Sequence, residues 1–243
     1  MAGVARNLRS AAGRGSRRGG LALALAAGLL VPGCAPQRVT RPVDTGPARP
    51  ADLFATLDRD GARAIPHHGY LGAEALLLLA DGTLLIRAGL EIDADGSPNA
   101  RALDPRHGQL TTSLQYPGQV GQDRYVDAER VPYIVLPRGL PERFGIALGD
   151  LAAVRYRGRT VFAVFADVGP ADRLGEGSIR LAELLGHRPW ERWDQGESFS
   201  THGGISSREV EFLVLPGVRV PLTSNATAEA DIAAAGARVG AAR

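Results

Sequence analysis

Residues 161–178 read VFAVFADVGPADRLGEGS, and the rest of the chain is organised around this stretch. An apolar run rich in β-forming residues ends at Asp167, and a Gly–Pro turn then leads to Glu176, which lies between two glycines. This pattern predicts a strand followed by a tight loop with a carboxylate at each end. An ordinary acidic turn followed by a helix cap is the alternative interpretation.

The composition limits both the fold and the chemistry. The chain has 243 residues, 44% of them hydrophobic, which is enough for one sizeable core. Its 31 glycines and 16 prolines favour a turn-rich β fold. All 28 basic residues are arginines, so Schiff-base chemistry and a Walker-type phosphate loop, which both need lysine, are excluded.

The first 34 residues indicate an export signal. Five arginines precede the short apolar run Leu21–Leu30, and Val31–Cys34 closes the segment. This arrangement resembles a bacterial lipoprotein signal, in which Cys34 would carry the lipid that anchors the protein to a membrane. We therefore expect an exported protein that is either anchored in the bacterial cell envelope or secreted. A buried cysteine that follows a disordered leader is the alternative.

Removing this leader reverses the sign of the net charge. The remaining chain has 23 arginines and 26 acidic residues, a formal charge of −3, against +2 for the whole chain. The sequence contains no basic patch of the kind that nucleic-acid-binding proteins carry, so we expect no nucleic-acid partner. An acidic exported domain is better suited to a neutral or cationic partner. Its single cysteine leaves the domain without a disulfide.

The domain organisation follows from changes in composition. Residues 35–52 are Pro-rich and predict a linker, residues 53–220 predict the folded domain, and residues 221–243 predict an Ala-rich tail or helix. Inside the domain, Ala73–Asp95 predicts a hairpin around an Asp–Gly turn, with a helix over its Leu-rich first half as the alternative.

Residues 151–165 predict a second hairpin, which delivers the chain to Asp167. After Glu176, Ser178 is a suitable N-cap for a short helix over Ile179–Leu185. The acidic loop is therefore expected to join a strand to a helix.

Two apolar segments that end in proline, Val131–Pro137 and Val210–Pro216, share the same pattern. Such a repeat predicts a mainly β fold built as a small closed β-barrel, of the double-psi type, with a few short helices. Closure removes the edges that short strands would otherwise expose. A chance likeness between two buried strands is the alternative.

A second acidic segment ends the first predicted hairpin. Asp93 and Asp95 alternate along the strand end before a glycine, a pattern that can ligate a cation, but the closing glutamate of an EF-hand loop is missing. We therefore interpret both as contacts for a cationic substrate, with turn capping as the alternative, and expect no metal and no cofactor. Trp190 and Trp193 are candidate sugar platforms, with packing into a satellite core as the alternative.

Several of these segments are similar to one family. The strand YVDAERVPYIVLP and, above all, the stretch FADVGPADRLGEGS resemble the chitosanases first described in fungi, glycoside hydrolase family 75. The similarity spans about Leu90 to Gly217, and the chain differs in a shorter segment between Pro98 and Leu110. The resemblance implies an inverting, endo-acting hydrolase of the β-1,4 links of chitosan, with Asp167 and Glu176 as its essential carboxylates.

Paired carboxylates suit this reaction, because one must be protonated to release the leaving oxygen while the other is ionised to activate water. We assign Glu176 as the general acid and Asp167 as the base. A helix N-terminus after Ser178 would favour an ionised Glu176, so exchanged roles are the alternative. We expect a monomer that acts on a polysaccharide. The competing interpretation is an inactive glycan-binding or structural envelope lipoprotein on the same barrel.

Overall fold

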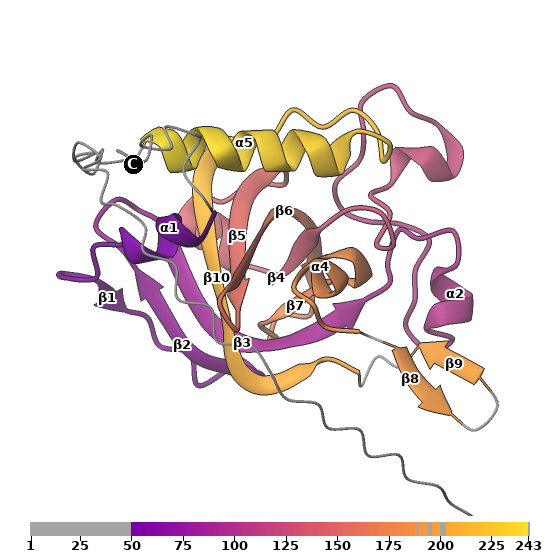
Figure 1. Cartoon of the computed structure of the whole chain (residues 1–243), viewed down its shortest axis with the longest axis horizontal. Coiled ribbons are helices and arrows are strands. Elements are labelled where there is room, and N and C mark those ends of the chain that lie inside the picture. Colours follow the sequence, from indigo (N-terminus) through magenta and orange to yellow (C-terminus); the bar gives the residue numbers. More distant parts are fainter. Residues whose placement is uncertain (1–49, 189, 194–195, 200–202, 243) are drawn as a thin grey trace, which may run out of the picture. The chain divides into compact units, whose positions relative to one another are not determined.

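The computed structural model describes residues 50–188, 190–193, 196–199 and 203–242 (Figure 1). The main sheet contains β1 (Arg63–Ala64), β2 (Ala73–Leu78), β3 (Leu84–Asp93), β4 (Tyr133–Pro137), β5 (Asp150–Tyr156), β6 (Arg159–Gly169), β7 (Glu176–Ser178) and β10 (Ile205–Arg219). A separate two-stranded sheet contains β8 (Trp190–Trp193) and β9 (Gly196–Phe199). The helices are α1 (Pro50–Ala55), α2 (Ala100–Leu103), the 3₁₀ helix η1 (Gly121–Arg124), α3 (Leu140–Phe144), α4 (Ile179–Leu184) and α5 (Ala228–Ala242).

The main sheet closes on itself. Its strand order is β1-β2-β3-β10-β5-β6-β4-β7, and additional pairing between β3 and β7 joins six of the eight strands into a barrel. Strands β1 and β2 continue the sheet outside the barrel. The predicted small closed β-barrel with a few short helices is therefore confirmed, while its assignment to the double-psi type stays a prediction.

Both predicted hairpins are present. Strands β2 and β3 pair in antiparallel register, and Gly82 in their turn has a φ of +84°, which favours glycine. The helical alternative for the Leu-rich run is wrong. Strands β5 and β6 also pair in antiparallel register, and their turn places Arg157 and Gly158 at φ values of +47° and +76°. Two successive positive φ values are typical of a tight hairpin turn that matches the strand twist.

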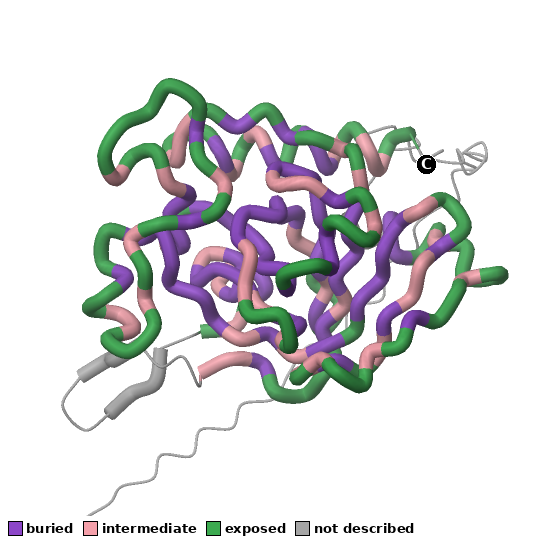
Figure 2. The backbone as a smooth tube through the Cα atoms, turned by 180° about the vertical axis from the view of Figure 1, so that it is seen from behind, coloured by how far each residue is buried: buried purple, intermediate pink, exposed green. Residues whose placement is uncertain are grey.

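The two similar segments that end in proline lie in β4 and β10. These strands are three positions apart in the closed order, and therefore on opposite sides of the barrel. Their apolar side chains help to fill one continuous core, and Figure 2 shows the buried part of the backbone concentrated in the barrel. Tyr133, Phe165 and Leu151 are among the largest fully buried side chains of this core.

The C-terminal segment is a helix rather than a frayed tail. Helix α5 buries Ile232 and packs against β6, where Gly236 faces the ring of Phe162. A Cβ on Gly236 would lie 2.1 Å from that ring, so this close approach requires glycine. Among the described residues, none of the helices combines the length and apolar character that crossing a membrane would require. Cys34 and most of the predicted linker lie outside the described residues.

Candidate active site

A β-bulge in β6 sets the position of Asp167. Phe165 is the partner of Ile134 in the parallel pair of β6 and β4, but the partner of the next residue, Val135, is Asp167. Ala166 is therefore an extra residue in β6. Bulges of this kind redirect the side chains that follow them and often lie beside active sites.

The bulge also attaches a neighbouring loop to the strand. The carbonyl oxygen of Ala166 accepts a hydrogen bond from the backbone N–H of Leu114 (2.8 Å). This contact places Ser113 beside Asp167, whose Oδ1 accepts hydrogen bonds from the Ser113 N–H (2.9 Å), the Ser113 hydroxyl (2.5 Å) and the Val168 N–H (2.8 Å). Within the described part of the chain, no group donates a hydrogen bond to the other oxygen of Asp167, Oδ2.

The loop that joins β6 to β7 is fixed against β3. Gly175 has a φ of +88°, and a Cβ there would lie 2.4 Å from the carbonyl oxygen of Gly89, so only glycine fits. The Gly175 carbonyl accepts a hydrogen bond from the N–H of Glu91 (2.6 Å), and the N–H of Leu174 donates to the carbonyl of Leu71 (3.0 Å). The predicted tight loop is thus present, and it delivers the chain to Glu176.

Asp167 and Glu176 lie level with each other on either side of β4. Val135 is the register partner of Asp167 in β6 and of Glu176 in β7. All three residues line one cavity of about 690 Å³, within the size range of pockets for small ligands. Two strand spacings put the α-carbons of the two acids about 9–10 Å apart. The sequence therefore correctly predicted that this loop brings two carboxyl groups to a common space.

The surroundings of Glu176 favour its protonated form. Burial raises the pKa of Glu176 to about 8, and the nearby charges of Asp93 and Glu91 raise it further than Arg173 lowers it. Gly169 keeps the space for this side chain open, because a Cβ there would lie 3.0 Å from Glu176 Oε2. Glu176 therefore carries a proton at neutral pH.

The predicted helix cap after Glu176 is confirmed. The hydroxyl of Ser178 accepts a hydrogen bond from the N–H of Leu181 (3.1 Å) and donates to the carbonyl of Val131 (2.7 Å). Glu176 itself belongs to β7, ahead of this cap. The raised pKa shows that burial and neighbouring acids outweigh any stabilisation of ionised Glu176 by the short helix.

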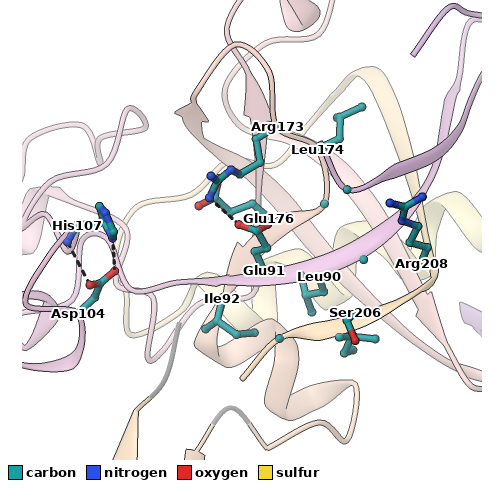
Figure 3. A pocket seen from close by; sticks show the side chains of 15 residues that line it. Leu90, Glu91, Ile92, Asp104, His107, Arg173, Leu174, Glu176, Ser206 and Arg208 are labelled. Atoms are coloured by element: carbon teal, nitrogen blue, oxygen red, sulfur yellow. Dashed lines mark hydrogen bonds and ion pairs between the residues drawn. The ribbon is translucent and has the colours of Figure 1, made fainter. Parts of the chain in front are cut away.

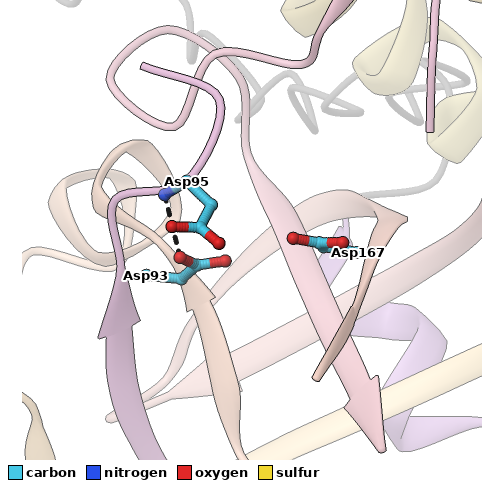
Figure 4. Close-up of side chains that lie close together, drawn as sticks. All are labelled: Asp93, Asp95 and Asp167. Atoms are coloured by element: carbon cyan, nitrogen blue, oxygen red, sulfur yellow. Dashed lines mark hydrogen bonds between the residues drawn. The ribbon is translucent and has the colours of Figure 1, made fainter. Parts of the chain in front are cut away.

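Asp93 and Asp95 line the same cavity as the first pair and face Asp167 (Figure 4). The three side chains are buried, with 7%, 8% and 8% of their surface exposed, respectively. Burial raises the pKa of Asp93 to about 7, and burial together with the charge of Asp93 raises that of Asp95 to about 8. The hydroxyl of Tyr133 lies 3.0 Å from Asp93 Oδ2, and Gln109 donates to both oxygens of Asp95 (2.7 and 3.0 Å).

This trio also offers the geometry of a cation site, because one oxygen from each carboxylate lies within 4.8 Å of the others. Hard cations such as Ca²⁺ and Mg²⁺ prefer such oxygen ligands. However, all four oxygens of Asp93 and Asp95 already accept hydrogen bonds from protein groups. Each of these oxygens keeps a second lone pair, so the trio can still contact a cation, whether a metal ion or an ammonium group.

A second cavity, of about 560 Å³, adjoins the first. Glu176, Arg173 and His107 line both cavities, so Glu176 lies where the two spaces meet. In Figure 3, Arg173 reaches toward Glu91, with which it forms an ion pair (2.7 Å between Arg173 Nη1 and Glu91 Oε2). Arg208 lies on the far side of this second cavity.

One pair of predicted residues cannot be placed in the site. Trp190 and Trp193 bound strand β8, but their side chains lie outside the described structure, so a sugar platform stays a prediction. Conversely, the sequence analysis missed Ser113, Tyr133 and Arg173. The polar run before Leu114 was a weak signal for Ser113, whereas nothing local marked the other two.

No family model matches the chain, and no curated protein matches it. The relation to glycoside hydrolase family 75 therefore stays a resemblance based on the motifs of residues 161–178 and their neighbours.

The raised pKa of Glu176 predicts a pH-dependent loss of stability. An unfolded glutamate ionises near pH 4.5, whereas folded Glu176 keeps its proton to about pH 8, so the free energy of unfolding should fall as the pH rises between these values. The variant Glu176→Gln should show a smaller fall, measured by urea denaturation across this range. Asp93 and Asp95 contribute with the same sign, so part of the fall should persist.

The matched control is Glu142→Gln, because Glu142 is exposed in α3 and does not line either cavity. An equal fall in wild type and Glu176→Gln would contradict the assignment of a buried, protonated Glu176.

Proposed function

We propose that this protein is a glycoside hydrolase that cleaves the β-1,4 links of chitosan, acting within the chain and with inversion at the anomeric carbon. The observation that carries the proposal is the placement of Asp167 and Glu176. They flank Val135, line one cavity, and have different surroundings. An acid and a base that share a cavity but differ in protonation are what hydrolysis of a glycosidic bond requires.

In this mechanism Glu176 is the general acid. Its proton passes to the glycosidic oxygen as the bond from that oxygen to the anomeric carbon breaks. The raised pKa of Glu176 supports this role, because the acid must be protonated at the working pH. The exchanged roles considered from the sequence are therefore the less favourable choice.

Asp167 is the base. Three hydrogen bonds fix its Oδ1, so Oδ2 is available to accept a proton from the attacking water. The water attacks the anomeric carbon from the face opposite the leaving group and gives its proton to Asp167. An inverting pair needs room for that water, with carboxyl groups about 6.5–9.5 Å apart, whereas those of a retaining pair lie roughly 5 Å apart. The α-carbons of Asp167 and Glu176 are two strand spacings apart, which suits the wider, inverting arrangement better.

Asp93 and Asp95 would contact the ammonium group of a glucosamine unit. In the free protein, the pKa values of both carboxyl groups are raised, so they tend to hold a proton. This proton reduces the repulsion between the two side chains. A bound ammonium would take over this role, because an opposite charge favours the ionised carboxylates. This contact would favour chitosan over a fully acetylated chain, whose nitrogen carries no charge.

The remaining parts of the proposal concern location. A lipid on Cys34 would tether the domain to the bacterial envelope through the Pro-rich segment, where the catalytic domain acts as a monomer on a polysaccharide. The first 34 residues carry the basic and apolar pattern on which this part rests.

The catalytic assignment predicts that Asp167→Asn and Glu176→Gln each lower the rate of chitosan hydrolysis by about 10²- to 10⁴-fold, the usual contribution of a general acid or base. Reducing ends released from chitosan oligomers measure the rate. Asp172→Asn is the matched control, because this exposed acid lies in the same loop. Near-wild-type rates in either catalytic variant would refute the assignment.

The ammonium contact predicts that Asp95→Asn weakens the binding of chitosan oligomers and flattens its dependence on salt, because one screened ion pair is lost. Calorimetric titration at two ionic strengths, with the exposed acid Asp60 changed to Asn as the control, measures this. Unchanged affinity and salt dependence in Asp95→Asn would show that Asp95 does not contact the substrate.

A further inference from the structure

Arg173 stands between two carboxyl groups that are neighbours across the sheet. In the parallel pair of β3 and β7, Glu91 is the register partner of Glu176. Arg173 contacts Glu91 through Nη1 at 2.7 Å and lines both cavities that meet at Glu176. Its backbone is fixed by a bridge to Leu71, so the guanidinium starts from a defined point in the wall.

One N–H group of the Arg173 guanidinium makes no hydrogen bond within the described structure. Arg173 Nε is buried, and within the described structure it has no hydrogen-bond partner. A buried donor without a partner is rare and costs free energy, so such a group commonly marks a functional position. Arginine carries five N–H donors in a planar fork, and it can therefore contact two carboxylates at once.

We propose that Arg173 is a positioning residue shared between Glu91 and Glu176. While Glu176 carries its proton, Arg173 pairs with Glu91. When that proton has passed to the leaving group, the guanidinium also compensates the new charge on Glu176. The inference rests on the proposed function for its catalytic meaning, because it explains how ionised Glu176 is stabilised at a site crowded with negative charge until it takes up a proton from solvent again.

The charged groups around Glu176 come from several elements. The acids are Glu91, Asp93 and Asp95 of β3 and its end, Asp167 of β6, and Asp104 after α2. The cationic groups are Arg173, Arg138 after β4, Arg208 of β10, and His107 when protonated. The positive charge of Arg173 lowers the pKa of Glu176.

Loss of either partner should move the titration of Glu176 in opposite directions. Arg173→Gln removes a cation and should raise the pKa of Glu176 by about one unit, whereas Glu91→Gln removes an acid, frees Arg173, and should lower it by about one unit. An ion pair whose charges do not act on Glu176 predicts no shift in either variant, because Glu176 would then be insensitive to both partners.

The test is the titration of the Glu176 carboxyl group by ¹³C NMR in the full chain, for wild type, Arg173→Gln, Glu91→Gln and Arg173→Lys. Arg173→Lys keeps the charge and should leave the titration near wild type. Arg208→Gln is the control, because Arg208 lines the second cavity but pairs with Glu74. The alkaline limb of the rate of chitosan hydrolysis should move with the titration in each variant.

The two proposals fail separately. Opposite shifts in Arg173→Gln and Glu91→Gln support the sharing of Arg173 even if chitosan is not cleaved, an outcome that would reject the proposed function alone. Shifts in the same direction, or none, overturn the role of Arg173 whether or not chitosan is cleaved. A shift in Arg208→Gln as large as that in Arg173→Gln would also overturn it, because the effect would then not be specific to this pair.

Discussion

The burial of several carboxyl groups around one cavity is the constraint on which the rest of this site depends. Unpaired negative charge in a buried space is costly, so each acid needs its own compensation. Glu176 keeps a proton, and Asp167 accepts three hydrogen bonds at one oxygen. Glu91, which is half exposed in the adjoining cavity, pairs with Arg173. Carboxyl groups of similar chemistry thus have different surroundings, and these surroundings favour different protonation states. This difference is what an acid and a base at one site require.

The barrel supplies the geometry for this arrangement. Closure through β3 and β7 brings Glu91 beside Glu176, and the bulge at Ala166 places Asp167 level with Val135. Because Gly175 has no side chain, its backbone can approach that of Gly89, and the loop between β6 and β7 lies tightly against β3. The fold thus places the acids on strands and at strand ends. Neighbouring strands restrict their movement there more than a free loop would.

Much of the fold could be predicted from local patterns. The Asp–Gly turn, the apolar alternation and Ser178 as a cap each act over a few residues, so both hairpins and the start of α4 follow from the sequence. The roles of Ser113, Tyr133 and Arg173 could not be predicted, because each contacts an acid that is distant in sequence. The bulge at Ala166 could not be predicted either, because it depends on how β6 is aligned with β4. The two tryptophans stay untested, because their side chains lie outside the described residues.

The position of two acids across one intervening strand would determine the stereochemistry of the proposed reaction. Room for a water molecule between Asp167 and the sugar implies a single displacement, whereas a closer pair would form a covalent intermediate. The most direct measurement is ¹H NMR of the first product released from chitosan oligomers, taken before the anomers equilibrate. With Asp167 as the base of an inverting pair, the α-anomer should form first from the β-linked substrate. Initial formation of the β-anomer, or no hydrolysis at all, would contradict it.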